Sequence, residues 1–264
     1  MPAVLHGLET RDTIRRVQLA RLAHHLLDFC YPGSCAACDE PCDGRSRLCE
    51  QCDAKLANFE NEAFCSRCAM PLGQHDAPCP HCFGEGARPF ERVLRLGTFT
   101  DPLKHLVHQI KYHHRWTLAE YLADRMLARD PVRRLLDDAD CIVAVPLHPF
   151  RHMSRGYNQA ELIAKRLAKR SKRKLVHPVV RLRNTETQTN LHSKQKRLEN
   201  LRGAFELSRP RAIRDRHVVV VDDVMTTGAT LHSIARTLLD AEPASLSAIV
   251  LAVADPRRQD FQSI

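Results

Sequence analysis

Two adjacent carboxylates, Asp222 and Asp223, follow directly on a run of four valines at positions 218–221. A β-branched run without polar alternation is typical of a strand that is buried on both faces of a parallel sheet. Threonines and a glycine come next, and an apolar periodicity typical of a helix begins at Leu231. Open α/β sheets bind ligands at the carboxyl ends of their strands, and a helix N-terminus presents N–H groups to phosphate. The sequence therefore predicts a ligand site here.

Acids beside a Thr/Gly turn suit a sugar phosphate better than a phosphate alone, because carboxylates repel a bare anion. The carboxylates can accept hydrogen bonds from ribose hydroxyls while the turn binds the 5-phosphate. The residues expected to form this turn are Val224, Met225, Thr226, Thr227, Gly228, Ala229 and Thr230. A buried strand and a capped helix without any ligand form the alternative, but a cap requires only one Ser or Thr. A P-loop is excluded, because the chain contains no Walker A sequence.

A second uninterrupted apolar run, residues 141–147, predicts a neighbouring buried strand. In a parallel sheet the end of this strand lies beside the end of the valine strand, so the turn with Pro146 and Leu147 faces the same ligand. We expect this turn to bind a pyrophosphate group. Arg155 is the expected anion clamp, since its guanidinium fork matches phosphate oxygens. Together with the two acids it is a candidate catalytic residue.

Eight of the eleven cysteines lie in four C-x2-C pairs within 48 residues: Cys35 and Cys38, Cys49 and Cys52, Cys65 and Cys68, Cys79 and Cys82. Two such pairs supply four thiolates to one tetrahedral zinc ion, in a closed structural site. The second set repeats the first with an offset of thirty residues, which indicates a duplicated unit and favours consecutive pairing over an interleaved cross-brace. Disulfides are the alternative, but reducing conditions in a cytosol disfavour them. We expect about two zinc ions.

The remaining pattern predicts an α/β protein in which helices flank a parallel sheet, with a small N-terminal four-cysteine module. The expected domains are an amphipathic helix over 1–33, a double zinc ribbon over 34–88 and an α/β domain over 89–264. Strands are expected at 92–100, 175–182 and 246–254, helices at 10–29, 103–112, 118–128 and 160–168, an acidic turn after 128, and a long basic lid over 183–205.

Forty Lys and Arg against thirty-one Asp and Glu give a formal charge of +9. This favours polyanionic partners but does not decide between nucleic acid and a phosphate-rich small ligand. Aromatic residues make up only 5%, which gives little support to a stacking platform for single strands. The longest apolar run, residues 248–254, is too short to cross a bilayer. With no signal-peptide pattern, the expected location is cytoplasmic.

The order of these parts resembles the ComF family, the competence-associated phosphoribosyltransferase-like proteins that include the GntX group. The resemblance is carried by the cysteine ribbons, VPLH at 145–148, RGYNQAE at 155–161, QTNL and RGAF within 188–205, and VDDVMTTGAT at 221–230. It implies a type I phosphoribosyltransferase fold that binds phosphoribosyl pyrophosphate (PRPP) with Mg²⁺. The two acids would then hold the ribose hydroxyls directly or through Mg²⁺. Lys111, at the end of a helix included in the resemblance, joins the expected PRPP-binding residues.

The same resemblance implies a role in natural competence and DNA uptake. The first hypothesis is an enzyme that transfers phosphoribosyl from PRPP to an unknown acceptor. The alternatives are a non-catalytic PRPP or nucleotide sensor, and a DNA-handling adaptor that binds single-stranded DNA or a competence helicase. The complete set of acids and turn residues favours the first two over a pure adaptor.

Overall fold

The computed structural model describes residues 33–43, 46–72, 79, 81–82, 86–183 and 203–254. The chain divides into two compact units, Met1–Lys55 and Leu56–Ile264. The expected N-terminal helix and most of the expected lid lie outside the described residues. In the part of the chain that is described, no helix has the length and apolar character needed to cross a membrane.

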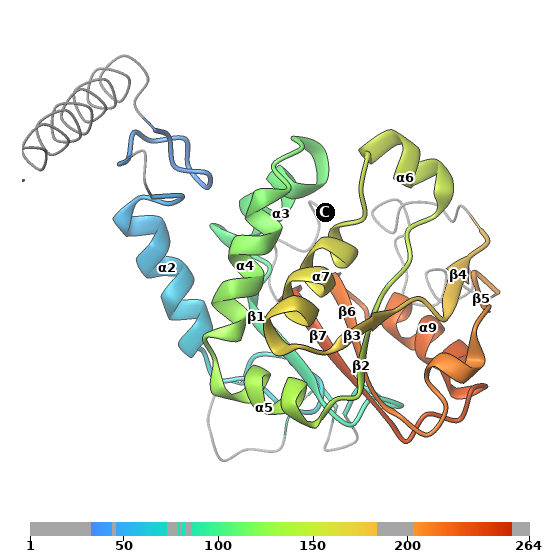
Figure 1. The fold of residues 1–264 in the computed structure, drawn as a ribbon. Helices are drawn as coiled ribbons and strands as arrows, with labels where there is room; N and C mark the ends of the chain where they lie inside the picture. Colours follow the sequence, from blue (N-terminus) through green and yellow to red (C-terminus); the bar gives the residue numbers. More distant parts are fainter. Residues whose placement is uncertain are drawn as a thin grey trace, which may run out of the picture. The chain divides into compact units, whose positions relative to one another are not determined.

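The second unit is built on a five-stranded parallel sheet with the strand order β1-β7-β6-β2-β3 (Figure 1). Its strands are β1 (Val93–Thr98), β2 (Cys141–Ala144), β3 (Lys174–Val176), β6 (His217–Met225) and β7 (Ser245–Val253). The valine run lies in β6, between β7 and β2, and all four valines are buried. The predicted doubly covered strand is therefore confirmed, and the fold is α/β.

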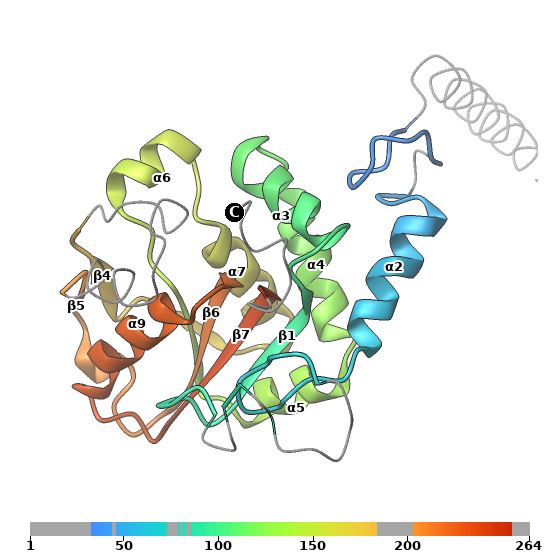
Figure 2. The same cartoon turned by 180° about the vertical axis from the view of Figure 1, so that it is seen from behind.

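Helices cover both faces of this sheet. In the described residues, the helices of the second unit are α3 (Leu103–Tyr112), α4 (Thr117–Leu127), α5 (Asp130–Asp138), α6 (Pro149–Arg155), α7 (Gln159–Ser171) and α9 (Ala229–Leu239), with a short 3-10 turn, η2, at Pro210–Ala212. A further helix, α2 (Glu50–Asn61), begins in the first unit and ends in the second. α4, α5 and α7 lie on one face, and α9 lies on the opposite face beside the small sheet of β4 (Val179–Arg181) and β5 (Phe205–Leu207) (Figure 2). α3 and α6 both rise beyond the carboxyl edge of the main sheet (Figure 1).

Two sequence expectations differ from the structure. The acidic turn expected after residue 128 is helix α5, which buries Val132, Leu135 and Leu136 on one side. The single strand expected over 175–182 is two strands, because Pro178 cannot donate to a strand ladder and interrupts it. β3 joins the main sheet, whereas β4 pairs antiparallel with β5.

The two cysteine segments have the same local backbone, thirty residues apart. An antiparallel bridge joins Ser34 to Pro41 in the first, and Phe64 to Pro71 in the second. The turn inside each bridge has a residue with positive φ at the equivalent position, Asp39 (61°) and Ala69 (61°). This repeated backbone matches the duplicated unit predicted from the spacing.

Candidate functional site

The cysteines form two groups of four. Within each group, Cys35/Cys38/Cys49/Cys52 and Cys65/Cys68/Cys79/Cys82, one sulfur from every residue lies within 4.8 Å of the others. The consecutive pairing is therefore the one adopted, and the cross-brace is wrong. The sulfur–sulfur distances of 3.7 Å (Cys38 to Cys49) and 3.6 Å (Cys68 to Cys79) are too long for disulfides, and all eight cysteines are present as thiols. Tetrahedral zinc with bonds of about 2.3 Å separates its sulfurs by about 3.8 Å, so both groups fit structural zinc.

Asp222 and Asp223, hereafter the acid pair, lie in β6 just beyond the point where β2 ends. The N–H of Val145 donates to the carbonyl oxygen of Val221 at 2.9 Å, which is the last contact between the two strands before the acids. The turn with Pro146 and Leu147, both partly exposed, therefore starts beside the acid pair. The two strand ends that the sequence predicted to face one ligand are brought together.

Lys111 joins this edge from the last turn of α3. Its ammonium Nζ lies 3.1 Å from Oδ2 of Asp223, and both side chains are largely buried, with 19% and 16% of their surface exposed. The Tyr157 hydroxyl donates to the carbonyl oxygen of Ile110, which ties the end of α3 to the segment before α7. The predicted PRPP-binding lysine is thus in direct contact with the predicted catalytic acid.

Asp222 lies in a different environment from its neighbour, because successive side chains of a strand point to opposite sides. Its Oδ1 accepts the backbone N–H of Asp223 at 2.9 Å. Burial and the charge of Asp223 raise the pKa of Asp222 to about 7, although that hydrogen bond, Lys111 and Arg181 act against the rise. At neutral pH, this carboxyl group is therefore partly protonated in the unliganded protein.

The turn after β6 opens α9. Gly228 has a φ of 74° and is the residue before the helix. Among the described residues beyond its chain neighbours, a Cβ on Gly228 would meet only the Met225 sulfur, at 3.9 Å, so the backbone conformation is what favours glycine there. Thr227 Oγ1 accepts the N–H of Ala229 at 3.4 Å. Met225 and Ala229 are buried and support the turn, whereas the others are partly exposed: Val224, Thr226, Thr227, Gly228 and Thr230. The exposed members are the ones that a phosphate could reach.

Arg155 lies at the end of α6. Its guanidinium stacks over the ring of Tyr112 with 5.2 Å to the centroid, and one N–H donates to Gln159 at 3.4 Å. Neither contact joins it to the acid pair. The structure therefore places Arg155 between α6 and the end of α3 on the same side of the molecule as the acids.

Two further arginines near this edge were missed by sequence reasoning. Burial and repulsion from Arg151 lower the pKa of Arg181 to about 10, while Asp222 opposes the change. Burial and the charge of Arg155 likewise lower the pKa of Arg151. For Arg151, the sequence signal was its spacing of four residues from Arg155, which puts both on one helix face. For Arg181, the signal was its position directly after the apolar pair Val179 and Val180.

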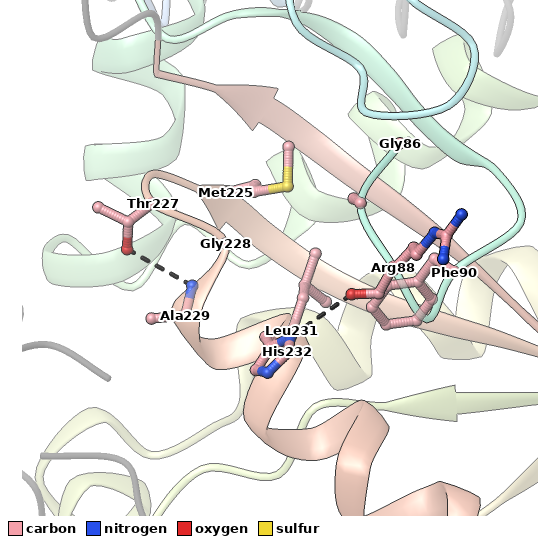
Figure 3. Close-up of a pocket in the computed structure, with 10 residues that line it drawn as sticks. Gly86, Arg88, Phe90, Met225, Thr227, Gly228, Ala229, Leu231 and His232 are labelled. Carbon is pink, nitrogen blue, oxygen red and sulfur yellow. Dashed lines mark hydrogen bonds between the residues drawn. The ribbon is translucent and has the colours of Figure 1, made fainter. Parts of the chain in front are cut away.

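A pocket of about 360 Å³ opens beside the turn (Figure 3). Gly228, Leu231 and His232 line it from the turn and α9, and Gly86 and Arg88 line it from the segment that follows the second cysteine group. Nδ1 of His232 lies 3.4 Å from the carbonyl oxygen of Arg88. The second cysteine segment therefore borders the turn through this pocket.

The parallel sheet, the acid pair and the glycine turn define a phosphoribosyltransferase-type domain, and the cysteine groups define a double zinc ribbon. Residues 153–263 match the phosphoribosyl transferase domain, and residues 26–83 match the double zinc ribbon domain. The chain is 35% identical to DNA utilization protein YhgH of Salmonella typhi, over 79% of this chain and 91% of that protein. It is 31% identical to competence protein F of Haemophilus influenzae, over 74% and 85% respectively. The chain therefore belongs to the ComF family.

A purine phosphoribosyltransferase from Pyrococcus horikoshii Ot3 is a structural neighbour. It shares 18% identity with a TM-score of 0.33, over 52% of this chain and 74% of that one. The family assignment rests on the sequence relatives and does not need this neighbour.

Proposed function

We propose that this chain binds PRPP together with Mg²⁺ and transfers the phosphoribosyl group to an acceptor. The observation that carries the proposal is a cation beside each member of the acid pair: Lys111 is ion-paired with Asp223, and Arg181 lies close enough to Asp222 to act on its charge. Arg151 acts in turn on Arg181, and Arg155 acts on Arg151. Like charges gathered in a partly buried place repel one another, and a polyanionic ligand relieves that repulsion. Hydroxyls for the acids and phosphates for the cations are both present in PRPP.

Each group has a role in this proposal. The acid pair accepts hydrogen bonds from the 2′ and 3′ hydroxyls of the ribose, and the turn that ends in Thr230 binds the 5-phosphate with N–H groups and hydroxyls. Mg²⁺ fits this donor set, since it prefers one or two carboxylates together with phosphate oxygens, and it would supply neutralising charge to the pyrophosphate. The arginines stabilise the charge that grows on pyrophosphate as its bond to the anomeric carbon breaks and the bond to the acceptor forms.

Calorimetric titration with PRPP tests the binding step. Wild-type protein is expected to show saturable binding that requires Mg²⁺. The double variant Asp222→Asn with Asp223→Asn loses it, and Asp138→Asn, an exposed acid of α5, retains it. A double variant that is folded by circular dichroism and still binds PRPP with wild-type affinity contradicts the assignment of the acid pair.

Release of pyrophosphate separates transfer from sensing. An enzyme releases pyrophosphate from PRPP when the acceptor is added, whereas a sensor binds PRPP without releasing it. The names of the relatives, DNA utilization protein and competence protein F, support a role linked to competence and the use of DNA, and we propose that the protein fills this role in DNA uptake from the cytoplasm. DNA fragments and nucleobases are therefore the first acceptors to screen.

Exposed aromatic side chains favour single-stranded DNA as a second ligand. Tyr112, Trp116 and Phe150 are 56%, 49% and 65% exposed, and they lie at the end of α3, in the connection from α3 to α4, and on α6. Aromatic rings next to arginines bind bases by stacking and phosphates by charge. Trp116→Ala with Phe150→Ala is expected to weaken filter binding of single-stranded DNA about thirtyfold or more, since stacking on each of the two rings is worth about 1–3 kcal/mol.

Leu239→Ala, an exposed apolar residue of α9, is the matched control and should bind DNA like wild type. Binding must also weaken as salt rises, because phosphate contacts release counterions. Absence of DNA binding at low salt removes this second function and leaves a helicase or other protein as the remaining partner class.

A further inference from the structure

We propose that Lys111 is a resident cation that holds Asp223 in the unliganded protein, so that Mg²⁺ occupies the acid pair only when it arrives with PRPP. The inference rests on the proposed function and adds an order of binding, in which Mg²⁺ and PRPP arrive together. The established geometry is the 3.1 Å ion pair between Nζ of Lys111 and Oδ2 of Asp223, with both side chains largely buried.

The ion pair and a bound metal compete for Asp223. Mg²⁺ binds a carboxylate oxygen at about 2.1 Å and requires nearly ideal octahedral geometry. An ammonium 3.1 Å from the same oxygen occupies one of its directions and repels a divalent cation placed in the others. Free Mg²⁺ must therefore displace Lys111 and gains no phosphate ligands in return. Mg²⁺ that carries PRPP brings those ligands with it.

The residues on both sides of Lys111 are held by the segment that begins at Arg155. Ile110 accepts a hydrogen bond from Tyr157, and Tyr112 lies under the Arg155 guanidinium. A pyrophosphate that attracts Arg155 therefore acts on the same short stretch of α3 that positions the lysine. Once it leaves Asp223, the ammonium remains beside the ligand on a four-carbon flexible stem and can pair with pyrophosphate oxygens.

Lys111 thus has two opposite effects on two ligands, which a purely structural lysine would not have. Its removal uncovers Asp223 and strengthens binding of a free divalent ion. The same removal weakens binding of metal-bound PRPP, because one cation is lost from the pyrophosphate side.

Titration with Mn²⁺ tests the first effect. Mn²⁺ shares the oxygen preference of Mg²⁺, and the free ion is counted directly by electron paramagnetic resonance. The zinc-loaded full chain without PRPP is titrated as wild type, Lys111→Gln, Lys111→Arg and Lys169→Gln. We expect at least fivefold tighter Mn²⁺ binding by Lys111→Gln alone. Lys111→Arg keeps the charge and Lys169 is an exposed residue of α7, so both should match wild type.

Calorimetry with PRPP and Mg²⁺ on the same proteins tests the second effect, and Lys111→Gln is expected to bind about tenfold more weakly than wild type. If wild type binds PRPP but Lys111→Gln binds Mn²⁺ with unchanged affinity, the inference about Lys111 is wrong and the proposed function stands. Wild type that binds no PRPP overturns the proposed function, while tighter Mn²⁺ binding by Lys111→Gln still supports Lys111 as the cation on Asp223. If Lys111→Gln does not fold, Lys111→Met replaces it in the same two titrations, with the same expected results.

Discussion

The two carboxylates of the acid pair are neighbours in sequence but not equivalent in structure. Asp223 is paired with Lys111 at 3.1 Å, whereas burial raises the pKa of Asp222 to about 7. Ionisation of Asp222 therefore lowers the free energy of unfolding of the unliganded protein. A ligand that binds the ionised form, such as a metal ion, recovers that free energy.

Replacement of Asp222 by Asn should stabilise the unliganded protein at high pH. The folded chain binds this proton more tightly than the unfolded chain, whose aspartate pKa is near 3.8, so stability falls as the pH rises from about 4 to about 7. The amide removes the ionisation and keeps an oxygen for the Asp223 N–H. Relief of about 1 kcal/mol would raise the Tm at pH 8 by roughly 2–4 °C.

Thermal unfolding of the two proteins at pH 4.5 and pH 8, without metal or PRPP, measures this effect. The stabilisation should be much smaller at the lower pH, where wild-type Asp222 is protonated in the folded chain. An equal shift at both values would mean that the substitution changes packing and not ionisation.

Arg181 should contribute to ligand binding although no motif contains it. It lies close enough to Asp222 and Arg151 to interact with both charges. A charge-assisted hydrogen bond to phosphate is worth about 1.5–3 kcal/mol, so Arg181→Gln should weaken PRPP binding with Mg²⁺ roughly tenfold or more. Arg236→Gln, on the exposed side of α9, should not. Equal affinities of the two variants would place Arg181 outside the site.

At the scale of elements, the outer edge of β1 shows how a buried charge is held. Arg95 has no exposed surface and donates to Glu62 at 2.7 Å and to Thr98 at 2.9 Å. Its guanidinium also lies over the ring of Phe64 at 5.3 Å. The segment between α2 and the second cysteine group therefore supplies the counter-charge for a strand of the main sheet.

Glu62→Gln should destabilise the second unit by roughly 3 kcal/mol, because it leaves a buried arginine without its anion. Urea unfolding monitored by circular dichroism gives this value. Asp130→Asn is the matched control, since it breaks the exposed ion pair with Arg133 and should cost less than about 1 kcal/mol. Equal losses would show that Arg95 is not dependent on Glu62.

Local sequence patterns predicted the strands and helices in which successive residues all favour the same secondary structure. The unbroken valine run predicted a central strand, and regular apolar spacing predicted α3, α4 and α7 to within a few residues at each end, and the presence of α9. The short helices α5 and α6 were missed, because acidic and proline-containing segments resemble turns when their packing partners are unknown. The place of β4 outside the main sheet depends on β5, which no local pattern reveals.

The site was predicted in the same partial way. The acid pair, the turn and the cysteine groups carry their chemistry in fixed spacing along the chain. The ion pair of Lys111, the tie from Tyr157 and the proximity of Arg181 to Asp222 join distant segments. Such contacts depend on how helices and strands pack, which spacing does not encode.

For the whole molecule, the two cysteine groups belong to different units, so they should be separable by mutation. Elemental analysis should find about two zinc ions per chain in wild type, and about one each in Cys38→Ser and Cys68→Ser. Only Cys68→Ser should lower the Tm of the unit that contains the main sheet. Cys42→Ser lies outside both groups and should keep both ions; two ions retained in either ligand variant would contradict the assignment.

The edge of β1 is covered by residues that precede it in the chain, so these residues cannot be removed without exposing the edge. A Cβ on Gly97 would lie 2.7 Å from the Phe59 side chain, and the N–H of Val93 donates to the carbonyl oxygen of Ser66. A chain that begins at residue 89 would lack Phe59 and Ser66, and the exposed edge of β1 could then pair with other molecules. The segment from Phe59 to Ser66 is therefore part of the scaffold of the main sheet, and a substitution in it should disturb the second unit as well as the cysteine groups that flank it.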